Sequence, residues 1–259
     1  MSVNEKMTDI ADRLRGYAHK TDKLALEDMP SGVDKAFGQG FLYGVNFIIN
    51  TWINKTEFWD VFQANGKRTD YSYAFNGDFF TEEMLKPKYS MKVSNAEKMF
   101  AQNGYLTSID TTNIDFSECT NFYQTFAGAS NATTIGAISA VNAPDLYATF
   151  LGDNGLVEIG VLTVSENTAF TSTFGYCVRL ENITFAGTIG QSILLKQCPL
   201  NRASIENILD HLSTTSQGQT LTLKSGLVDT AFETSEGAGD GRAVFETLIA
   251  DKTNWSFSY

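Results

Sequence analysis

Only two histidines, His19 and His211, are available for acid–base or nucleophilic chemistry. A Ser-His-Asp or Cys-His nucleophile needs a histidine beside it, and these two lie in segments that we do not expect to meet. The sequence also lacks a G-x-x-x-x-G-K-[ST] loop, a G-x-S-x-G turn and an H-E-x-x-H pair. We therefore predict no nucleophilic active site and interpret both histidines as surface residues of helices.

The three cysteines could in principle bind a metal or form disulfides. Cys119, Cys177 and Cys198 are odd in number and show no C-x-x-C spacing. Zinc sites and disulfide frameworks both need paired cysteines. We expect three buried thiols, no bound metal and no cofactor.

Carboxylates are the remaining candidates for catalysis. A pair of carboxylates can hydrolyse a glycan, but the acidic residues near the repeats described below share no regular offset. These residues are Asp110, Asp115, Asp153 and Glu158. A second acidic group lacks the residue order of a calcium loop. Its members are Asp229, Glu233, Glu236 and Asp240. We interpret both groups as solvated surface, and a glycan hydrolase on a repeat scaffold is the alternative that the sequence favours least.

The composition limits which classes of partner the chain can bind. The formal net charge of −11 disfavours nucleic acid, because phosphate binding needs clustered lysine and arginine. Apolar residues make up 42% of the chain, as in folded proteins. The first residues, MSVNEKMTDIADRLRG, carry charges where a signal peptide has its apolar core, so no secretory signal is expected.

The elements that would position any site follow from a repeat in the middle of the chain. One set of phenylalanines recurs after 26, 24 and 24 residues, and each is followed nine residues later by an isoleucine. The phenylalanines are Phe100, Phe126, Phe150 and Phe174, and the isoleucines are Ile109, Ile135, Ile159 and Ile183. Units this short cannot bury their own apolar face, so the pattern predicts stacked coils with a phenylalanine column and parallel strands at the isoleucines.

The strand residues beside the isoleucines should point outward, since side chains alternate along a strand. The expected outward row is Ser108, Asp110, Thr134, Glu158, Asn182 and Thr184. This row is small, polar and mildly acidic. Two interpretations stay open: a binding face, and a sheet face that is merely solvated.

The fourth unit reads Phe174-Gly-Tyr-Cys177-Val-Arg-Leu180-Glu-Asn-Ile183. It resembles the F-x-x-C-x-x-L-x-x-I consensus of BspA-like leucine-rich repeats, which occur on bacterial surface proteins and in phage tail proteins. The other units hold Asn103, Ala129 and Asp153 at the cysteine position. The resemblance implies a short parallel β-solenoid and a role in contacting another protein or a glycan.

Both flanks of the repeats should act as caps, since terminal repeats otherwise leave apolar surface and strand edges in water. Residues 66–95 are expected to form the N-terminal cap. The C-terminal stretch alternates a helix at 201–212, a strand at 220–223, helices at 228–232 and 243–250, and a strand at 254–259. Its order, CPL-helix-TLTL-helix-NW, resembles the end of gut-bacterial and prophage leucine-rich-repeat proteins.

Residues 1–65 differ in character. The segment MTDIADRLR…TDKLALEDMPSGV resembles a small module at the start of phage tail and fibre proteins. A second helix is expected from about residue 33 to 63, apolar nearly all round, which favours burial by self-association. Its heptad-spaced residues are Phe41, Val45, Ile48, Trp52, Trp59 and Phe62. A membrane span over 36–54 is the alternative, but Gln39, Asn46 and Asn50 disfavour it.

These observations predict an α+β protein. Residues 1–65 form a helical assembly and anchoring region, 66–95 an N-terminal cap, 96–198 a leucine-rich-repeat-like parallel β-solenoid, and 199–259 an α/β C-terminal cap. The predicted function is that of a non-catalytic phage or prophage tail component in the virion. It would associate with itself, as a trimer or ring, and with other virion proteins, and present the repeats for decoration or for recognition of a host-surface protein or glycan. A bacterial cell-surface adhesin of the same repeat family is the second hypothesis.

Overall fold

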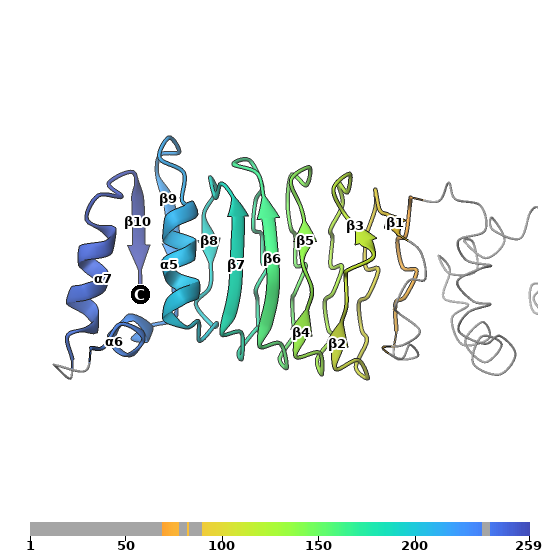
Figure 1. Ribbon diagram of the computed structural model, residues 1–259, viewed down its shortest axis with the longest axis horizontal. Coiled ribbons are helices and arrows are strands. Elements are labelled where there is room, and N and C mark those ends of the chain that lie inside the picture. The colour runs from red at the N-terminus through yellow and green to blue at the C-terminus, as the bar shows by residue number, and fades with distance from the viewer. Residues whose placement is uncertain (1–68, 78–81, 83–89, 235–238) are drawn as a thin grey trace, which may run out of the picture. The chain divides into compact units, whose positions relative to one another are not determined.

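A computed structural model of the chain describes residues 69–77, 82, 90–234 and 239–259. These residues belong to one compact unit. Within it the chain winds through successive coils that stack side by side, and short strands from each coil line up along the stack (Figure 1). The coils end at a group of helices and strands at the C-terminal end.

All strand pairs are parallel, as a solenoid requires. The coils contain β1 (Met91–Lys92), β2 (Ser108–Ile109), β3 (Ile114–Asp115), β4 (Thr134–Ile135), β5 (Ile138–Ser139), β6 (Glu158–Val164), β7 (Asn182–Gly187) and β8 (Ile193–Leu194). The C-terminal part contains α5 (Arg202–His211), β9 (Gln219–Thr222), α6 (Leu227–Ala231), α7 (Gly241–Ile249) and β10 (Trp255–Ser258). The largest sheet runs β2-β4-β6-β5, with β7 also paired to β6.

The isoleucines of the repeat are paired directly across this sheet. Ile109 lies opposite Ile135, Ile135 opposite Ile159, and Ile159 opposite Ile183. Each is at most 2% exposed. A β-branched side chain suits a pleated, buried strand position, which accounts for its return in every coil.

Four stacked ring pairs form a phenylalanine column through the coils. The ring centroids of Phe100, Phe126 and Phe150 repeat at 5.5 Å with interplanar angles of 3° and 5°. Phe174 continues the stack at 5.7 Å. Phe75 also belongs to it, with its ring 5.3 Å from that of Phe100. The column therefore extends into residues 66–95, the segment expected to be the cap, and the 25-residue spacing from Phe75 to Phe100 was visible in the sequence.

Main-chain hydrogen bonds also join the coils around the phenylalanines, outside the named strands. The amide of Phe126 donates to the carbonyl of Thr149, and that of Phe150 to Thr173. The residues two before each column phenylalanine all have a left-handed backbone, with φ between 50° and 57°. They are Tyr73, Lys98, Gln124, Ala148 and Ser172. None is glycine, so each carries a backbone cost of about 1–2 kcal/mol. The amides of the first four donate to carbonyls of the next coil, and these bonds help to offset that cost.

Buried threonine hydroxyls add a second link between coils. Threonine precedes three of the column phenylalanines, and each Oγ1 donates to a carbonyl of the preceding coil at 2.8–3.0 Å. The donors are Thr125, Thr149 and Thr173, and the acceptors are the carbonyls of Ala96, Phe122 and Leu146. Because all three threonines are at most 1% exposed, water cannot replace these bonds.

This arrangement predicts that Thr149→Val destabilises the solenoid by about 1–2 kcal/mol, since the shape is kept while the carbonyl of Phe122 loses a buried donor. Thr133→Val is the matched control. Thr133 Oγ1 also donates to a carbonyl of the preceding coil, that of Thr107, but Thr133 is exposed. Urea unfolding should show a lower midpoint for Thr149→Val only. Equal midpoints for the two variants would contradict a structural role for the buried hydroxyl.

Side chains bond the main chain at both ends of the largest sheet. At the β2 edge, Glu82 Oε1 accepts from the amide of Ser108 at 3.1 Å. At the β7 edge, α5 stands where another strand would lie. The amide of Ile183 donates to Ser204 Oγ at 2.9 Å, and that of Phe185 donates to Asn207 Oδ1 at 2.6 Å. An exposed strand edge invites pairing with other chains, and these contacts prevent it.

The N-terminus of α5 fits this role. Asn201 is its N-cap, with its side chain accepting from the amide of Ser204 at 2.9 Å. Asn201, Ser204 and Asn207 are spaced three apart, so they share one helix face. That face is the one turned to β7.

We predict that Asn207→Ala lowers the free energy of unfolding by about 1–2 kcal/mol, because the amide of Phe185 loses its acceptor. Asp210→Ala, an exposed position on the same helix, serves as control and should change stability little. Denaturant unfolding measures both. Indistinguishable stabilities for Asn207→Ala and the wild type would rule out the helix as a functional edge cap.

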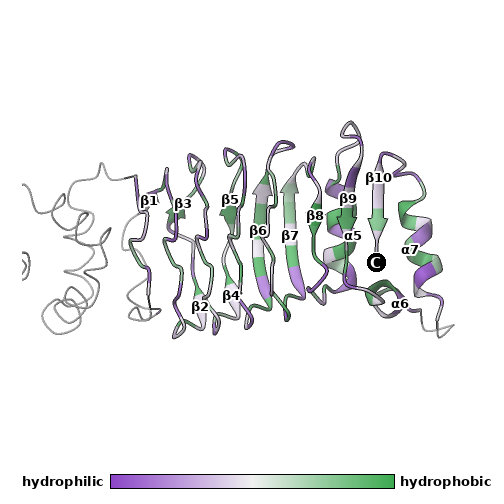
Figure 2. Ribbon diagram, turned by 180° about the vertical axis from the view of Figure 1, so that it is seen from behind, coloured by the Kyte–Doolittle hydropathy of each residue, from purple (hydrophilic) through white to green (hydrophobic). Residues whose placement is uncertain are grey.

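The parallel β-solenoid and the α/β composition of the C-terminal part confirm the corresponding sequence predictions. Apolar colour follows the strands, and hydrophilic residues gather in the turns at their ends (Figure 2). The helical region predicted for 1–65 and the alternative membrane span over 36–54 lie outside the described residues. Among the helices that the structure describes, none is long and apolar enough to cross a membrane.

Candidate binding surfaces

Four of the residues predicted to point outward form one continuous row across the sheet. Ser108 is paired with Thr134, Thr134 with Glu158, and Glu158 with Asn182. Thr134 and Glu158 are exposed. The ends of the row are already engaged: the Ser108 amide bonds Glu82, and the Asn182 side-chain oxygen accepts from Asn201 Nδ2. The open part of the row is thus short.

The other two predicted residues do not extend this row. Asp110 forms a local turn in which its Oδ1 accepts from the amide and the hydroxyl of Thr112, at 2.9 and 2.6 Å. Thr184 lies opposite Val161 rather than Gly160, because the register between β6 and β7 shifts between Ile159 and Val161. Both side chains are exposed, but neither continues the row.

A second surface, on the side of the phenylalanine column, carries stacked aromatic and cationic side chains. We call it the tyrosine ladder; it consists of Tyr73, Lys98, Tyr123 and Tyr147. The rings of Tyr123 and Tyr147 stack at 5.2 Å with an interplanar angle of 8°. Lys98 Nζ lies 5.3 Å from the ring centroid of Tyr73 and 5.6 Å from that of Tyr123.

Polar contacts fix one end of this ladder. Tyr73 donates its hydroxyl hydrogen to Glu97 Oε1 at 3.1 Å, and Asn121 Nδ2 donates to the other carboxylate oxygen at 3.3 Å. Tyr123 therefore has both ring faces covered, one by Tyr147 and one by the Lys98 ammonium. Tyr123 and Tyr147 nevertheless remain 38% and 42% exposed. Two tyrosines held rigid in this way present apolar area with little conformational entropy left to lose.

The tyrosine ladder was not predicted from the sequence. Tyr123 and Tyr147 both stand three residues before a column phenylalanine and are 24 residues apart, which was a usable signal. This tyrosine spacing is found in only two coils. Tyr73 and Lys98 come from the neighbouring position, two residues before the phenylalanine, so no single offset identifies the whole set.

The position three residues after Phe100, Phe126, Phe150 and Phe174 is buried and holds Asn103, Ala129, Asp153 and Cys177, in that order. Asn103 Nδ2 donates to the carbonyls of Phe75 and Phe100, both at 2.7 Å. Cys177 Sγ points to the carbonyl of Phe150 at 3.1 Å. Asp153 Oδ1 accepts from the amide of Ala129 at 2.8 Å, while its Oδ2 has no hydrogen-bond partner among the described residues.

Burial raises the pKa of Asp153 well above its usual range, although the amides of Ala129 and Gly128 act in the opposite direction. Burial therefore favours the neutral acid over the carboxylate at this position. Burial also raises the pKa of the thiols, to about 11 for Cys119 and about 12 for Cys198, and raises that of Cys177 as well. Thiols held in this protonated form are poor nucleophiles.

Because the folded pKa of Asp153 exceeds the unfolded value, the folded state binds its proton more tightly. The neutral carboxyl contributes fully below about pH 4, and stability falls as pH rises from there toward the folded pKa. Asp153→Asn should remove this loss and raise the free energy of unfolding at pH 7 by at least about 1 kcal/mol. Asn103 shows that the same position accepts an amide.

Thermal unfolding between pH 4 and pH 7 measures this effect. The advantage of Asp153→Asn over the wild type should grow as pH rises. Glu158→Gln removes an exposed carboxylate and is expected to leave the pH dependence unchanged. A pH-independent difference between Asp153→Asn and the wild type would show that Asp153 is not held neutral.

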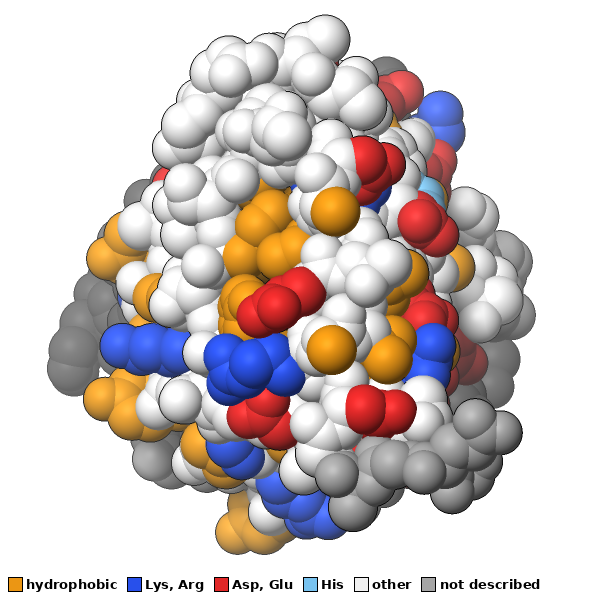
Figure 3. Space-filling view, turned by 90° about the vertical axis from the view of Figure 1, so that its left-hand side faces the viewer, with side chains coloured by type: hydrophobic (Ala, Val, Ile, Leu, Met, Phe, Trp, Pro, Cys, Tyr) orange, Lys and Arg blue, Asp and Glu red, His pale blue; other side chains and the backbone are white. Residues whose placement is uncertain are grey.

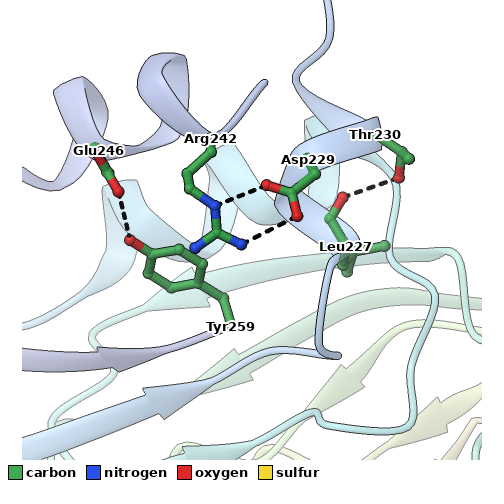
Figure 4. Close-up of polar contacts among 6 residues, drawn as sticks. All are labelled: Leu227, Asp229, Thr230, Arg242, Glu246 and Tyr259. Atoms are coloured by element: carbon green, nitrogen blue, oxygen red, sulfur yellow. Dashed lines mark hydrogen bonds and ion pairs between the residues drawn. The ribbon is translucent and has the colours of Figure 1, made fainter. Parts of the chain in front are cut away.

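The C-terminal end joins α6, α7 and β10 through exposed charges. Asp229 on α6 pairs with Arg242 on α7 in a bidentate contact of 2.9 and 3.0 Å, and the guanidinium lies 5.2 Å from the ring centroid of Tyr259 (Figure 4). The Tyr259 hydroxyl donates to Glu246 at 3.2 Å. Figure 3 shows this end, where apolar, acidic and basic side chains are interspersed. We interpret the cluster as a structural clamp, since each charge has its partner.

None of the described residues forms a histidine, cysteine and carboxylate group that could hold a metal ion. His211 Nδ1 lies 2.8 Å from the carbonyl of Asn207 within its own helix, and His19 is outside the described part of the chain. The six residues predicted for the oligomer helix, Phe41, Val45, Ile48, Trp52, Trp59 and Phe62, also lie outside it.

Comparisons with protein-family models, curated proteins and solved structures gave no match for this chain.

Proposed function

We propose that this chain is a non-catalytic component of a phage or prophage tail, in which a BspA-like leucine-rich-repeat solenoid is carried by an N-terminal assembly region. The observation that supports it best is the shared environment of the F-x-x-C-x-x-L-x-x-I positions. Phe174, Cys177, Leu180 and Ile183 are all buried, and the equivalent phenylalanines and isoleucines of the other coils stack on them.

The chemistry of the described coils supports a binding role. Their buried polar groups, such as Thr149 and Asn103, hydrogen-bond the main chain of neighbouring coils. Burial raises the pKa of Asp153 and of the three thiols, which disfavours their ionised, nucleophilic forms. We therefore place the binding role on the surface, where the outward row and the tyrosine ladder lie. On a virion these surfaces would serve decoration or host-surface recognition.

The assembly part of the proposal rests on the heptad-spaced apolar residues from Phe41 to Phe62. We expect the purified full-length chain to form a defined homo-oligomer in multi-angle light scattering. Ile48→Asp should dissociate it, because a charge at the apolar seam cannot be buried without a partner. Asn50→Asp adds the same charge off the seam and should leave the mass unchanged. A wild-type chain that is a single subunit at micromolar concentration would refute the assembly role.

A further inference from the structure

Side-chain donors recur at one buried position of the solenoid, three residues after the column phenylalanine. Asn103 Nδ2 donates to the carbonyl of Phe75 at 2.7 Å, and Cys177 Sγ donates to that of Phe150 at 3.1 Å. Both acceptors belong to the preceding coil. Cys198 Sγ makes the same kind of contact one coil further on, at 3.9 Å. The carbonyl of one coil is thus met by a donor from the next.

Asp153 holds this position in its own coil but has no donor when it is ionised. Its Oδ1 accepts from the amide of Ala129 at 2.8 Å, while Oδ2 is buried and has no hydrogen-bond partner among the described residues. In Asn103 the corresponding atom, Nδ2, donates to the carbonyl of its own phenylalanine as well as to the preceding one, both at 2.7 Å. The carbonyls that correspond in the coil of Asp153 are those of Phe150 and Phe126.

We propose that Asp153 carries a proton on Oδ2 and donates it to the main-chain carbonyl of Phe126, which makes the contact between these two coils sensitive to pH. The neutral carboxyl accepts at Oδ1 and donates at Oδ2, as an amide does. Loss of the proton would set a carboxylate oxygen against carbonyl oxygens of the same partial charge in a buried site. The contact is therefore intact at low pH and weakens as pH rises.

The surroundings of Asp153 offer it no countercharge. The same position holds Ala129 in the preceding coil and Cys177 in the next. Burial raises the pKa of the Cys177 thiol, so this titratable neighbour stays neutral as well. Burial also raises the pKa of Asp153, and the groups that oppose it are the main-chain amides of Ala129 and Gly128 rather than a charged side chain. This direction agrees with the missing donor, and the inference does not depend on the proposed tail role.

Infrared difference spectra of the full-length chain detect the proton directly. At about pH 7 an ordinary carboxyl is ionised, since its pKa lies near about 4. We expect a protonated-carboxyl C=O stretch in the wild type and its absence in Asp153→Asn, whereas Glu158→Gln, which removes an exposed carboxylate, should keep the band. Asn103→Asp in the Asp153→Asn background should restore the band, because it moves the acid to the equivalent place in another coil. Identical spectra for the wild type and Asp153→Asn would overturn the proposal.

Amide hydrogen exchange, expressed as protection factors, locates the effect. The amides of Phe126 and Gly128 donate to the coil of Asp153, and those of Phe100 and Gln102 bond across the neighbouring interface. The first pair should lose protection about tenfold or more between about pH 5 and about pH 8, since each unit of raised pKa is a tenfold change. The second pair should keep its protection, and Asp153→Asn should protect both pairs throughout. Equal losses at the two interfaces, or losses that persist in Asp153→Asn, would contradict a local pH-sensitive contact.

Discussion

The parallel main-chain hydrogen bond between one coil and the next is the interaction on which this structure depends. It sets a separation of about 4.8 Å between equivalent strands and applies it to every atom of the coil. Any side chain repeated at one position must then stack on its own copies. The phenylalanine rings follow this rule, with centroids 5.3–5.7 Å apart, and so do the paired isoleucines. Because every coil is displaced from the last by the same distance, equivalent positions have equivalent surroundings, and the same residue type recurs there in the sequence.

The regular stacking of coils also requires strained backbone conformations and a way to end the sheet. A left-handed residue is required at the same place in each coil, and Lys98, Gln124 and Ala148 accept it without being glycine. Their amides bond the next coil, so relaxing the backbone would break the ladder. Strand pairing must also end at the last coil. At the β7 edge, side chains of helix α5, Ser204 and Asn207, accept the hydrogen bonds that another strand would otherwise accept. No further strand can then pair with this edge.

Features that repeat from coil to coil could be predicted from the sequence, and features confined to one coil were harder to predict. The column, the strands at the isoleucines and the C-terminal cap elements were predictable, because each repeats with the period or has its own hydrophobic pattern. Phe75 was missed although its spacing fits, since the residues after it do not repeat the rest of the motif. The register shift beside Gly160 was missed, because it depends on β7 having one residue fewer than β6. Ile159 and Leu162 are three residues apart, whereas their partners Ile183 and Phe185 are two apart. The burial of Asp153 could have been inferred from Cys177, its equivalent in a better-matched coil.

The surface of such a fold varies where the repeat is broken. A surface residue that recurs in every coil finds its copy as neighbour, and its contact area is consumed by that copy. Tyr123 illustrates this, since Tyr147 and Lys98 take its two faces. The next coil has Thr171 at the equivalent position, so the stacked rings end at Tyr147. The interior can therefore stay regular for stability, because the buried column sets it, while the surface side chains change from one coil to the next.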